Sequence, residues 1–217
     1  LIRLTARRDL IDDALEFAKK LRKHTNLEVS FNIFNITSYA DLELDSVVDK
    51  VIDSSLEYVY MADTHGHLDL NRDMGKFEKH FKKIKKTGKK TGFHLHNHTG
   101  KAYMNYIKCK ESLYVDLCDT SVMSLGKGAG NLKLEDVLSD EKSFLLNEFI
   151  FKHYDTVFKK TVSPYYLVTG RYGITDNYAT QAEKLKTPMH KFINFCYGVS
   201  GLKIDNFDKN ILKEFCG

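Results

Sequence analysis

Two histidines, His94 and His96, lie two positions apart in the apolar run F-H-L-H-N-H. Side chains two residues apart on a β-strand project from the same face, and we expect residues 92–97 to form a strand with Leu95 facing the other way. Two imidazoles on one face can offer two nitrogen ligands to a divalent metal. The alternative is a pair of core histidines satisfied by hydrogen bonds, which is the more frequent explanation of an isolated H-x-H pattern.

The elements around this run alternate between strands and helices. We expect strands at residues 1–5, 27–33, 58–62, 91–97 and 114–123, and helices at residues 9–23, 39–54, 71–86 and 101–111, with a further helix starting at 132–138. This alternation predicts an α/β fold with a parallel sheet. Polar residues gather at the carboxyl ends of the strands, where a (β/α)8 barrel carries its active site and an open doubly wound sheet binds its ligand.

About five βα units can be counted, whereas a complete (β/α)8 barrel needs about 250 residues. We therefore expect residues 1–138 to be the C-terminal part of a barrel domain that is incomplete at its N-terminus. Residues 139–217 lack strand alternation and are expected to form a helical C-terminal extension, with helices at 144–158, 177–186, 190–195 and 207–215.

The composition is that of a globular protein, with 217 residues, 42% hydrophobic content and a net charge of +4. Much of the charge lies in the lysine-rich residues 76–90, where Phe77, Phe81 and Ile84 predict an amphipathic helix with a solvated outer face rather than a nucleic-acid site. The four cysteines form no C-x-x-C pair, and no apolar run approaches the roughly 20 residues of a membrane span. We expect a cytoplasmic protein with neither nucleic-acid nor membrane partners.

Three segments at the ends of consecutive predicted strands carry a family resemblance: Y-M-A-D-T-H-G at residues 60–66, H-L-H-N at residues 94–97, and D-T-S-V-M-S-L-G-K-G-A-G-N at residues 119–131. In this order they resemble the DRE-TIM metallolyase superfamily, which includes hydroxymethylglutaryl-CoA lyase, isopropylmalate synthase and 4-hydroxy-2-oxovalerate aldolase. The aldolase branch is the most similar. The resemblance covers about residues 1–138, and residues 165–170 and 177–179 resemble the tails of aldolase-like members more loosely.

The resemblance implies a (β/α)8 barrel with one divalent metal, for which His94 and His96 match the two histidine ligands. Asn131 matches an asparagine at or near the metal, although it could instead be the N-cap of a helix beginning at Leu132. Asp63 and Thr64 match a motif that lines the substrate site, and a hydrogen-bonded strand end is the alternative for Asp63.

Asn97 and Asn105 match two further family positions, and Asn105 could be only structural. The family's metal-binding aspartate and its adjacent arginine lie on a first strand that this chain does not contain. The glycine loop at residues 126–130 lacks the cysteine of the lyase branch, which weakens a hydroxymethylglutaryl-CoA lyase interpretation. His98 and Ser124 also depart from the family pattern.

The chemistry implied is metal-assisted enolate formation. A 2-oxo acid such as pyruvate can chelate a divalent ion, which then acts as a Lewis acid on the enolate. Nitrogen and oxygen ligands suit Mn²⁺ or Mg²⁺, with Co²⁺ or Zn²⁺ as alternatives. The glycine loop either closes over the site or makes a tight turn, and His98, His65 and Tyr166 are candidate general bases.

The hypothesis is a metal-dependent aldolase or lyase that acts on a small 4-hydroxy-2-oxo acid. One alternative is an acyl-CoA-dependent Claisen synthase of the isopropylmalate type. Another is a catalytically inactive truncated barrel. A homo-oligomer and a partner dehydrogenase are both open as protein partners.

Overall fold

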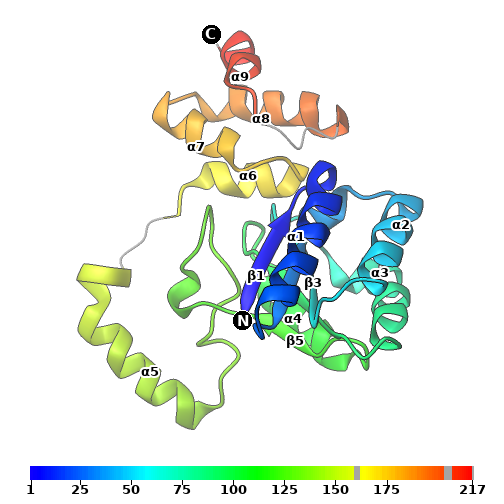
Figure 1. The fold of residues 1–217 in the computed structure, drawn as a ribbon. Coiled ribbons are helices and arrows are strands. Elements are labelled where there is room, and N and C mark those ends of the chain that lie inside the picture. The colour runs from blue at the N-terminus through cyan, green and yellow to red at the C-terminus, as the bar shows by residue number, and fades with distance from the viewer. Residues whose placement is uncertain (159–161, 203–206, 217) are drawn as a thin grey trace. The chain divides into compact units, whose positions relative to one another are not determined.

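The computed structural model describes residues 1–158, 162–202 and 207–216 (Figure 1). The chain divides into two compact units, and each is described by itself. The first unit contains Leu1–Thr64, Leu68–Leu95 and Met104–Asp119. The second contains His65–His67, His96–Tyr103 and Thr120–Gly217. The predicted boundary at residue 138 does not coincide with this division, because short strand-end segments group with the C-terminal part.

The first unit is built on a five-stranded parallel sheet. Its strands are β1 (Ile2–Ala6), β2 (Val29–Ile33), β3 (Tyr58–Asp63), β4 (Lys90–Leu95) and β5 (Leu117–Asp119), and they lie side by side in chain order. Parallel crossovers are right-handed, so a sequential order places every connecting helix on one face of the sheet. The expected α/β fold is confirmed, and this order lacks the reversal of a doubly wound sheet.

The helices of this unit also agree with the sequence pattern. They are α1 (Ile11–His24), α2 (Asp41–Ile52), α3 (Leu70–Lys85) and α4 (Ala102–Glu111), of which the first two residues of α4 belong to the second unit. Short 3-10 turns precede α1 at Arg8–Leu10 and α2 at Ile36–Ser38. Figure 1 shows α1, α2 and α3 lying along the strands.

The face of the sheet that the helices cover is apolar. Fully buried side chains alternate along the central strands: Val29, Phe31 and Ile33 on β2, Val59 and Met61 on β3, Phe93 and Leu95 on β4. Phe93 packs edge-on against Phe77 and Phe81 of α3, with ring centroids 5.7 and 5.0 Å apart. Since Phe77, Phe81 and Ile84 are all buried, the predicted apolar stripe of α3 is confirmed.

The sequence pattern of residues 9–23 also predicts an apolar face on α1, and this prediction is partly wrong. The predicted residues are Leu10, Ala14, Phe17, Ala18 and Leu21. Phe17 and Leu10, which were expected to face the core, are 53% and 43% exposed. The buried residues of α1 are Ile11 and Ala18, seven positions apart. A 3-10 turn occupies Arg8–Leu10, so Leu10 precedes the α-helix, which begins at Ile11 and buries the face that carries Ile11 and Ala18.

The lysine-rich face of α3 is paired with acidic residues of α2. Three aspartates spaced four apart on α2 face a basic row on α3, and the ion pairs are Lys76–Asp41, Lys79–Asp45, His80–Asp45 and Lys83–Asp49. His80 is 1% exposed and also bonds the carbonyl of Lys76 through Nδ1 at 2.7 Å. The lysines are therefore part of a helix-to-helix contact as well as of a solvated surface.

The second unit is largely helical in its C-terminal part. Its helices are α5 (Asp140–His153), which continues as a π-helix at Tyr154–Phe158, α6 (Pro164–Tyr172), α7 (Asn177–Lys184), α8 (Met189–Val199) and α9 (Lys209–Cys216). Four of the five were expected, and α6 was not. Tyr178, Phe192 and Phe195 are fully buried in a core that α6, α7, α8 and α9 share. Residues 159–161, 203–206 and 217 of the predicted extension lie outside the described residues.

The predicted helix at residues 132–138 is wrong, because this segment follows an extended path and then turns. Lys133 forms a parallel bridge with Ser121. The Ser121 N–H donates to the Leu132 carbonyl, and the Leu134 N–H donates to the Ser121 carbonyl, both at 3.0 Å. These bonds use backbone groups that a helix would need for itself. No helix in the described part of the chain is long and apolar enough to span a membrane.

Phe93 offers a test of how the sheet is held to its helices. We expect Phe93→Ala to lower the free energy of unfolding by about 4 kcal/mol, because it leaves a cavity between β4 and α3. The matched control is Phe17→Ala, which removes a half-exposed ring and should cost under about 1 kcal/mol. Chemical denaturation of both variants gives the comparison, and equal losses would contradict the assigned core.

Candidate functional site

The face of the sheet opposite the helices carries polar side chains, and one ion pair crosses all of it. Arg3 on β1 makes two hydrogen bonds to the Asp119 carboxylate on β5, of which the Nη2 to Oδ1 bond measures 3.1 Å. Four strand spacings separate β1 from β5, about 19 Å in a flat sheet, which is far beyond the reach of an arginine. The sheet must therefore curl, with the Arg3 side concave.

The Arg3 guanidinium is held from several sides on this concave face. Its Nε donates to Ser30 Oγ at 3.2 Å, and its central carbon lies 4.4 Å from the ring centroid of Tyr60. Burial raises the pKa of the Tyr60 hydroxyl. Asn32 on β2 is 4% exposed, and its Oδ1 accepts no hydrogen bond from the described residues. The concave face thus combines a fixed cation with an unsatisfied amide oxygen.

His94 lies on the same face and contacts the same carboxylate. Its Nδ1 is 2.8 Å from Asp119 Oδ2, and the two residues are register partners on β4 and β5. Burial pushes the pKa of Asp119 upward, but the hydrogen bonds from His94 and Arg3 and their charges outweigh burial and hold this pKa below its usual value. Asp119 is therefore an ionised acceptor shared between an arginine and a histidine.

His96 lies just beyond the end of β4 and belongs to the second unit. The predicted strand at residues 92–97 is too long, since β4 ends at Leu95. His96 instead pairs with Asn131 in an isolated antiparallel bridge, and the neighbouring Asn97 N–H donates to the Gly130 carbonyl at 2.8 Å. The chain switches partners at this point, from β3 and β5 to the glycine loop.

Asn131 is held by this bridge and does not cap a helix, so the N-cap alternative is wrong. Its Nδ2 donates to the Leu125 carbonyl at 3.2 Å, and its carbonyl accepts a hydrogen bond from the Ser124 hydroxyl. Its Oδ1 is buried and accepts no hydrogen bond from the part of the chain that the structure describes. A buried amide oxygen without a donor is suited to a cation.

Asp63 and Thr64 have hydrogen-bonding roles at the end of β3. Asp63 Oδ1 accepts the Leu68 N–H at 3.1 Å, and Thr64 Oγ1 accepts the Asn35 N–H at 2.7 Å. Asp63 is 1% exposed and pairs in register with Leu95, so it lies on the helix-covered side of the sheet rather than with His94. The structure therefore shows Asp63 as a hydrogen-bonded residue at a strand end, which was the alternative to a substrate contact.

The two remaining asparagines also contact backbone groups. Asn105 is buried, accepts the Leu70 N–H at 2.9 Å and donates to the Leu68 carbonyl at 3.0 Å, which is a structural role. Asn97 Oδ1 accepts the Ala102 N–H at 3.2 Å where α4 begins.

Asn97 also borders a pocket of about 240 Å³ in the second unit. The other lining residues are Met123, Ser124, Ala129, Lys133, Tyr154 and Val162.

The glycine loop is a tight turn fastened at two points. Gly130 has φ +91°, and a Cβ there would lie 1.9 Å from the Ser124 carbonyl oxygen, so only glycine fits. Lys127 pairs with Asp176 at 2.8 Å and donates to Asn177 Oδ1 at 3.0 Å, which joins the loop to the start of α7. These contacts support the tight-turn alternative for this loop.

Two of the three candidate general bases are buried in the second unit, and Tyr166 is half-buried. His65 and His98 are 2% and 4% exposed, and the Tyr166 hydroxyl is 3.1 Å from Thr180 Oγ1. Burial lowers the pKa of His65 to about 4, with Asp176 opposing and the nearby histidines and Lys127 assisting this shift. His65 is therefore neutral at pH 7, and neither histidine is exposed to solvent.

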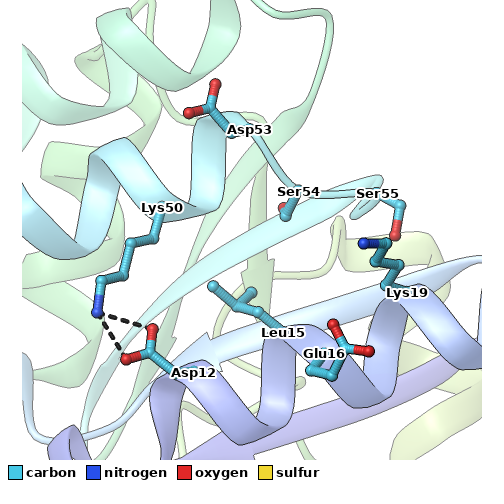
Figure 2. Close-up of a pocket in the computed structure, with 8 residues that line it drawn as sticks. All are labelled: Asp12, Leu15, Glu16, Lys19, Lys50, Asp53, Ser54 and Ser55. Atoms are coloured by element: carbon cyan, nitrogen blue, oxygen red, sulfur yellow. Dashed lines mark hydrogen bonds and ion pairs between the residues drawn. The ribbon is translucent and has the colours of Figure 1, made fainter.

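Helix α1 and the end of α2 border a pocket of about 380 Å³ (Figure 2). Figure 2 shows Lys50 extending toward Asp12, and the distance from Lys50 Nζ to Asp12 Oδ1 is 2.7 Å. Its lining includes Asp53, Ser54 and Ser55, which precede β3, so it lies at the amino end of the strands and contains none of the predicted site residues.

Within the described ranges, no three His, Cys, Asp or Glu side chains come together as a metal-binding group. The residues that the sequence predicts as metal ligands are two imidazoles and an amide oxygen, and the surroundings of two of them can be compared with a metal-binding role. His94 fits because metal-bound histidines usually donate their other ring N–H to a carboxylate, which Asp119 supplies here. Asn131 fits through its buried, unsatisfied Oδ1.

Comparison with known families gives a match over most of the chain. The family model described as HMGL-like matches residues 4–143, which include all three motif segments. The chain belongs to the HMGL-like family. The resemblance to DRE-TIM metallolyases is thereby confirmed at the family level.

Solved structures with a similar fold share little sequence with this HMGL-like chain. Pyruvate carboxylase from Rhizobium etli matches with a TM-score of 0.67 and 13% identity over 100% of this chain and 24% of its own. Its carboxyl transferase domain matches with a TM-score of 0.63 and 14% identity over 90% of this chain and 37% of that one.

The N-terminal domain of a proposed aldolase from Bacteroides vulgatus gives a TM-score of 0.46 and 22% identity over 99% of this chain and 61% of its own. The HMGL-like chain thus spans less than two thirds of each of these structures. No curated protein matches it.

Sequence reasoning missed Arg3, Asn32 and Asp119 as parts of the polar face. The signal that could have found them is the alternation of side chains within each strand. Arg3, Ser30 and Asn32 point to the same face of the sheet as His94, and the apolar residues between them point to the other face. This second, polar face is missed when each strand is treated as a continuous apolar run.

The lowered pKa of His65 predicts a pH-dependent stability. Because its folded pKa of about 4 lies below the unfolded value of 6.5, the unfolded chain takes up the proton first as pH falls. The stabilisation is complete above about pH 6.5 and is lost toward pH 4. Between pH 7.5 and pH 5, unfolding free energy should fall by about 2 kcal/mol more in the wild type than in His65→Gln. Parallel slopes in urea titrations would contradict this prediction.

The backbone conformation of Gly130 requires a residue without a side chain, and this can be tested by substitution. Gly130→Ala should lower the free energy of unfolding by more than about 2 kcal/mol, because the added Cβ collides with backbone and φ is positive. The matched control is Gly75→Ala on α3, where a Cβ meets nothing within 4 Å and should stabilise by about 1 kcal/mol. Thermal unfolding measures the stability of both variants. A Gly130→Ala variant as stable as the wild type would contradict the assigned loop geometry.

Proposed function

We propose that this HMGL-like protein is a divalent-metal-dependent aldolase or lyase that cleaves or forms a carbon–carbon bond in a 4-hydroxy-2-oxo acid. Its domain is proposed to be a (β/α)8 barrel of which these five strands are the last, an assignment that the sequential, curled parallel sheet supports. The observation that carries the proposal is the family match across residues 4–143, with the histidine pair inside it.

The proposed metal ligands are His94, His96 and Asn131, with Mn²⁺ or Mg²⁺ as the favoured ion. Support comes from each unit separately: the Asp119 contact to His94 in the first, and the His96–Asn131 bridge with its unsatisfied amide oxygen in the second. That both histidines bind one ion is inferred from their spacing and the family motif. A divalent ion held there would act as a Lewis acid on a bound 2-oxo acid.

The chain's own residues would then orient ligands and substrate. Asp119 holds the His94 ring, and Asn97 borders the 240 Å³ pocket, where Lys133 supplies a positive charge for a carboxylate. The burial of His65 and His98 favours a supporting role for both over direct proton exchange with a substrate.

The proposal predicts a specific loss of activity. The protein, supplied with Mn²⁺, should release pyruvate from a 4-hydroxy-2-oxo acid. Lactate dehydrogenase reduces the released pyruvate, and the loss of NADH measures the rate. His94→Ala and His96→Ala should each lower kcat by at least about 100-fold, since each removes a proposed ligand. The exposed His24→Ala is the matched control and should retain full activity.

Other outcomes would contradict the assignment. Consumption of acetyl-CoA without any aldol cleavage would indicate the Claisen synthase. Absence of both activities in a folded, metal-supplied protein would indicate an inactive barrel. Equal activity of the wild type and both histidine variants would reject the ligand set.

A further inference from the structure

The Asp119 carboxylate has two partners on the concave face, Arg3 of β1 and His94 of β4. Its Oδ2 accepts the hydrogen bond from His94 Nδ1 at 2.8 Å, and both of its oxygens accept bonds from Arg3. The side chains of Asp119 and His94 are 18% and 22% exposed, so solvent competes weakly for this contact. The carboxylate therefore has a defined direction at the concave face.

An ionised carboxylate can only accept hydrogen bonds, so the nitrogen of the neutral His94 ring that faces Asp119 must be the one that carries the proton. If Asp119 faces Nδ1, then the ring proton belongs on Nδ1 and the lone pair belongs on Nε2. The ring is also fixed in direction, because the acceptor that orients it is itself fixed.

Arg3 supplies that fixation. The planar guanidinium fork matches the two carboxylate oxygens and sets the plane of the carboxylate. The guanidinium is in turn held by Ser30 Oγ at 3.2 Å and stacked at 4.4 Å over the Tyr60 ring. A chain of contacts thus runs from β1 through β5 to the imidazole on β4.

We propose that Asp119, held by Arg3, is a positioning residue that keeps His94 in the Nδ1–H tautomer with Nε2 directed for metal binding. This inference rests on the proposed metal site. It gives a role to Arg3 and to Asp119, the first residue of the third motif segment, for which the resemblance implies none. The competing explanation is that the Arg3–Asp119 pair only fastens the outer strands of the sheet.

A second aspartate provides a matched control for that competing explanation. Asp116, which precedes β5, accepts the Thr91 N–H at 3.0 Å and pairs with Lys85. It resembles Asp119 in joining β4 to the β5 segment, but its partners are the backbone amide and hydroxyl of Thr91 and a lysine. Asp116→Asn should therefore affect stability without affecting His94.

The first measurement needs no metal. In the metal-free, ¹⁵N-labelled protein at pH 8, long-range proton–nitrogen correlation spectra report which ring nitrogen carries the proton, and His94→Gln identifies the signal. We expect the Nδ1–H tautomer in the wild type and in Asp116→Asn. Asp119→Asn should move His94 toward the Nε2–H form, because an amide can turn its N–H toward Nδ1.

The second measurement is Mn²⁺ affinity by calorimetric titration. Asp119→Asn should weaken binding by about 10- to 100-fold. Arg3→Lys, which keeps the charge but loses the fork, should cause a smaller loss. Asp116→Asn should bind as the wild type does, and circular dichroism confirms that each variant is folded.

Two results would overturn the inference. One is an Nε2–H tautomer of His94 in the wild type. The other is a folded Asp119→Asn variant with unchanged tautomer and unchanged Mn²⁺ affinity. A wild type that binds no Mn²⁺ would instead reject the proposed metal site, and the tautomer would still decide whether Asp119 positions His94.

Discussion

The ion pair between Arg3 and Asp119 is the interaction on which the geometry of the first unit depends. It joins the first and last strands of a five-stranded sheet, which only a strongly curled sheet allows. The curl gives the sheet two unlike faces: a convex apolar face under helices, and a concave face with charged and amide groups. His94 lies on the concave face because alternation along β4 places it opposite Phe93 and Leu95.

The second unit depends on a different constraint, the positive φ of Gly130. The loop can pass close to the Ser124 carbonyl only without a side chain, and this passage brings Asn131 back to pair with His96. Lys127 then fastens the loop to Asp176 at the start of α7. Each unit therefore presents one histidine held by a defined partner, Asp119 for His94 and Asn131 for His96.

Local patterns predicted the parallel strands, the α3 core and the family, because alternation and short motifs are properties of neighbouring residues. They could not predict the Arg3–Asp119 contact, whose members are 116 positions apart and meet only once the sheet curls. The N-cap alternative for Asn131 failed for the same reason, since this residue forms a bridge with His96, a residue distant in the sequence, instead of starting a helix. At the start of α1, the 3-10 turn at Arg8–Leu10 takes Leu10 out of the α-helix, which no periodicity starting at residue 9 anticipates.

The central claim is that His94 and His96 bind one divalent ion. Pulsed electron paramagnetic resonance of the Mn²⁺-loaded protein tests it most directly, with [¹⁵N]histidine labelling to mark imidazole nitrogens bound to the ion. The account predicts coupling to two histidine nitrogens, reduced to one in either His94→Ala or His96→Ala and unchanged in His24→Ala. Absence of histidine coupling in the wild type, or coupling unaffected by both ligand variants, would contradict it.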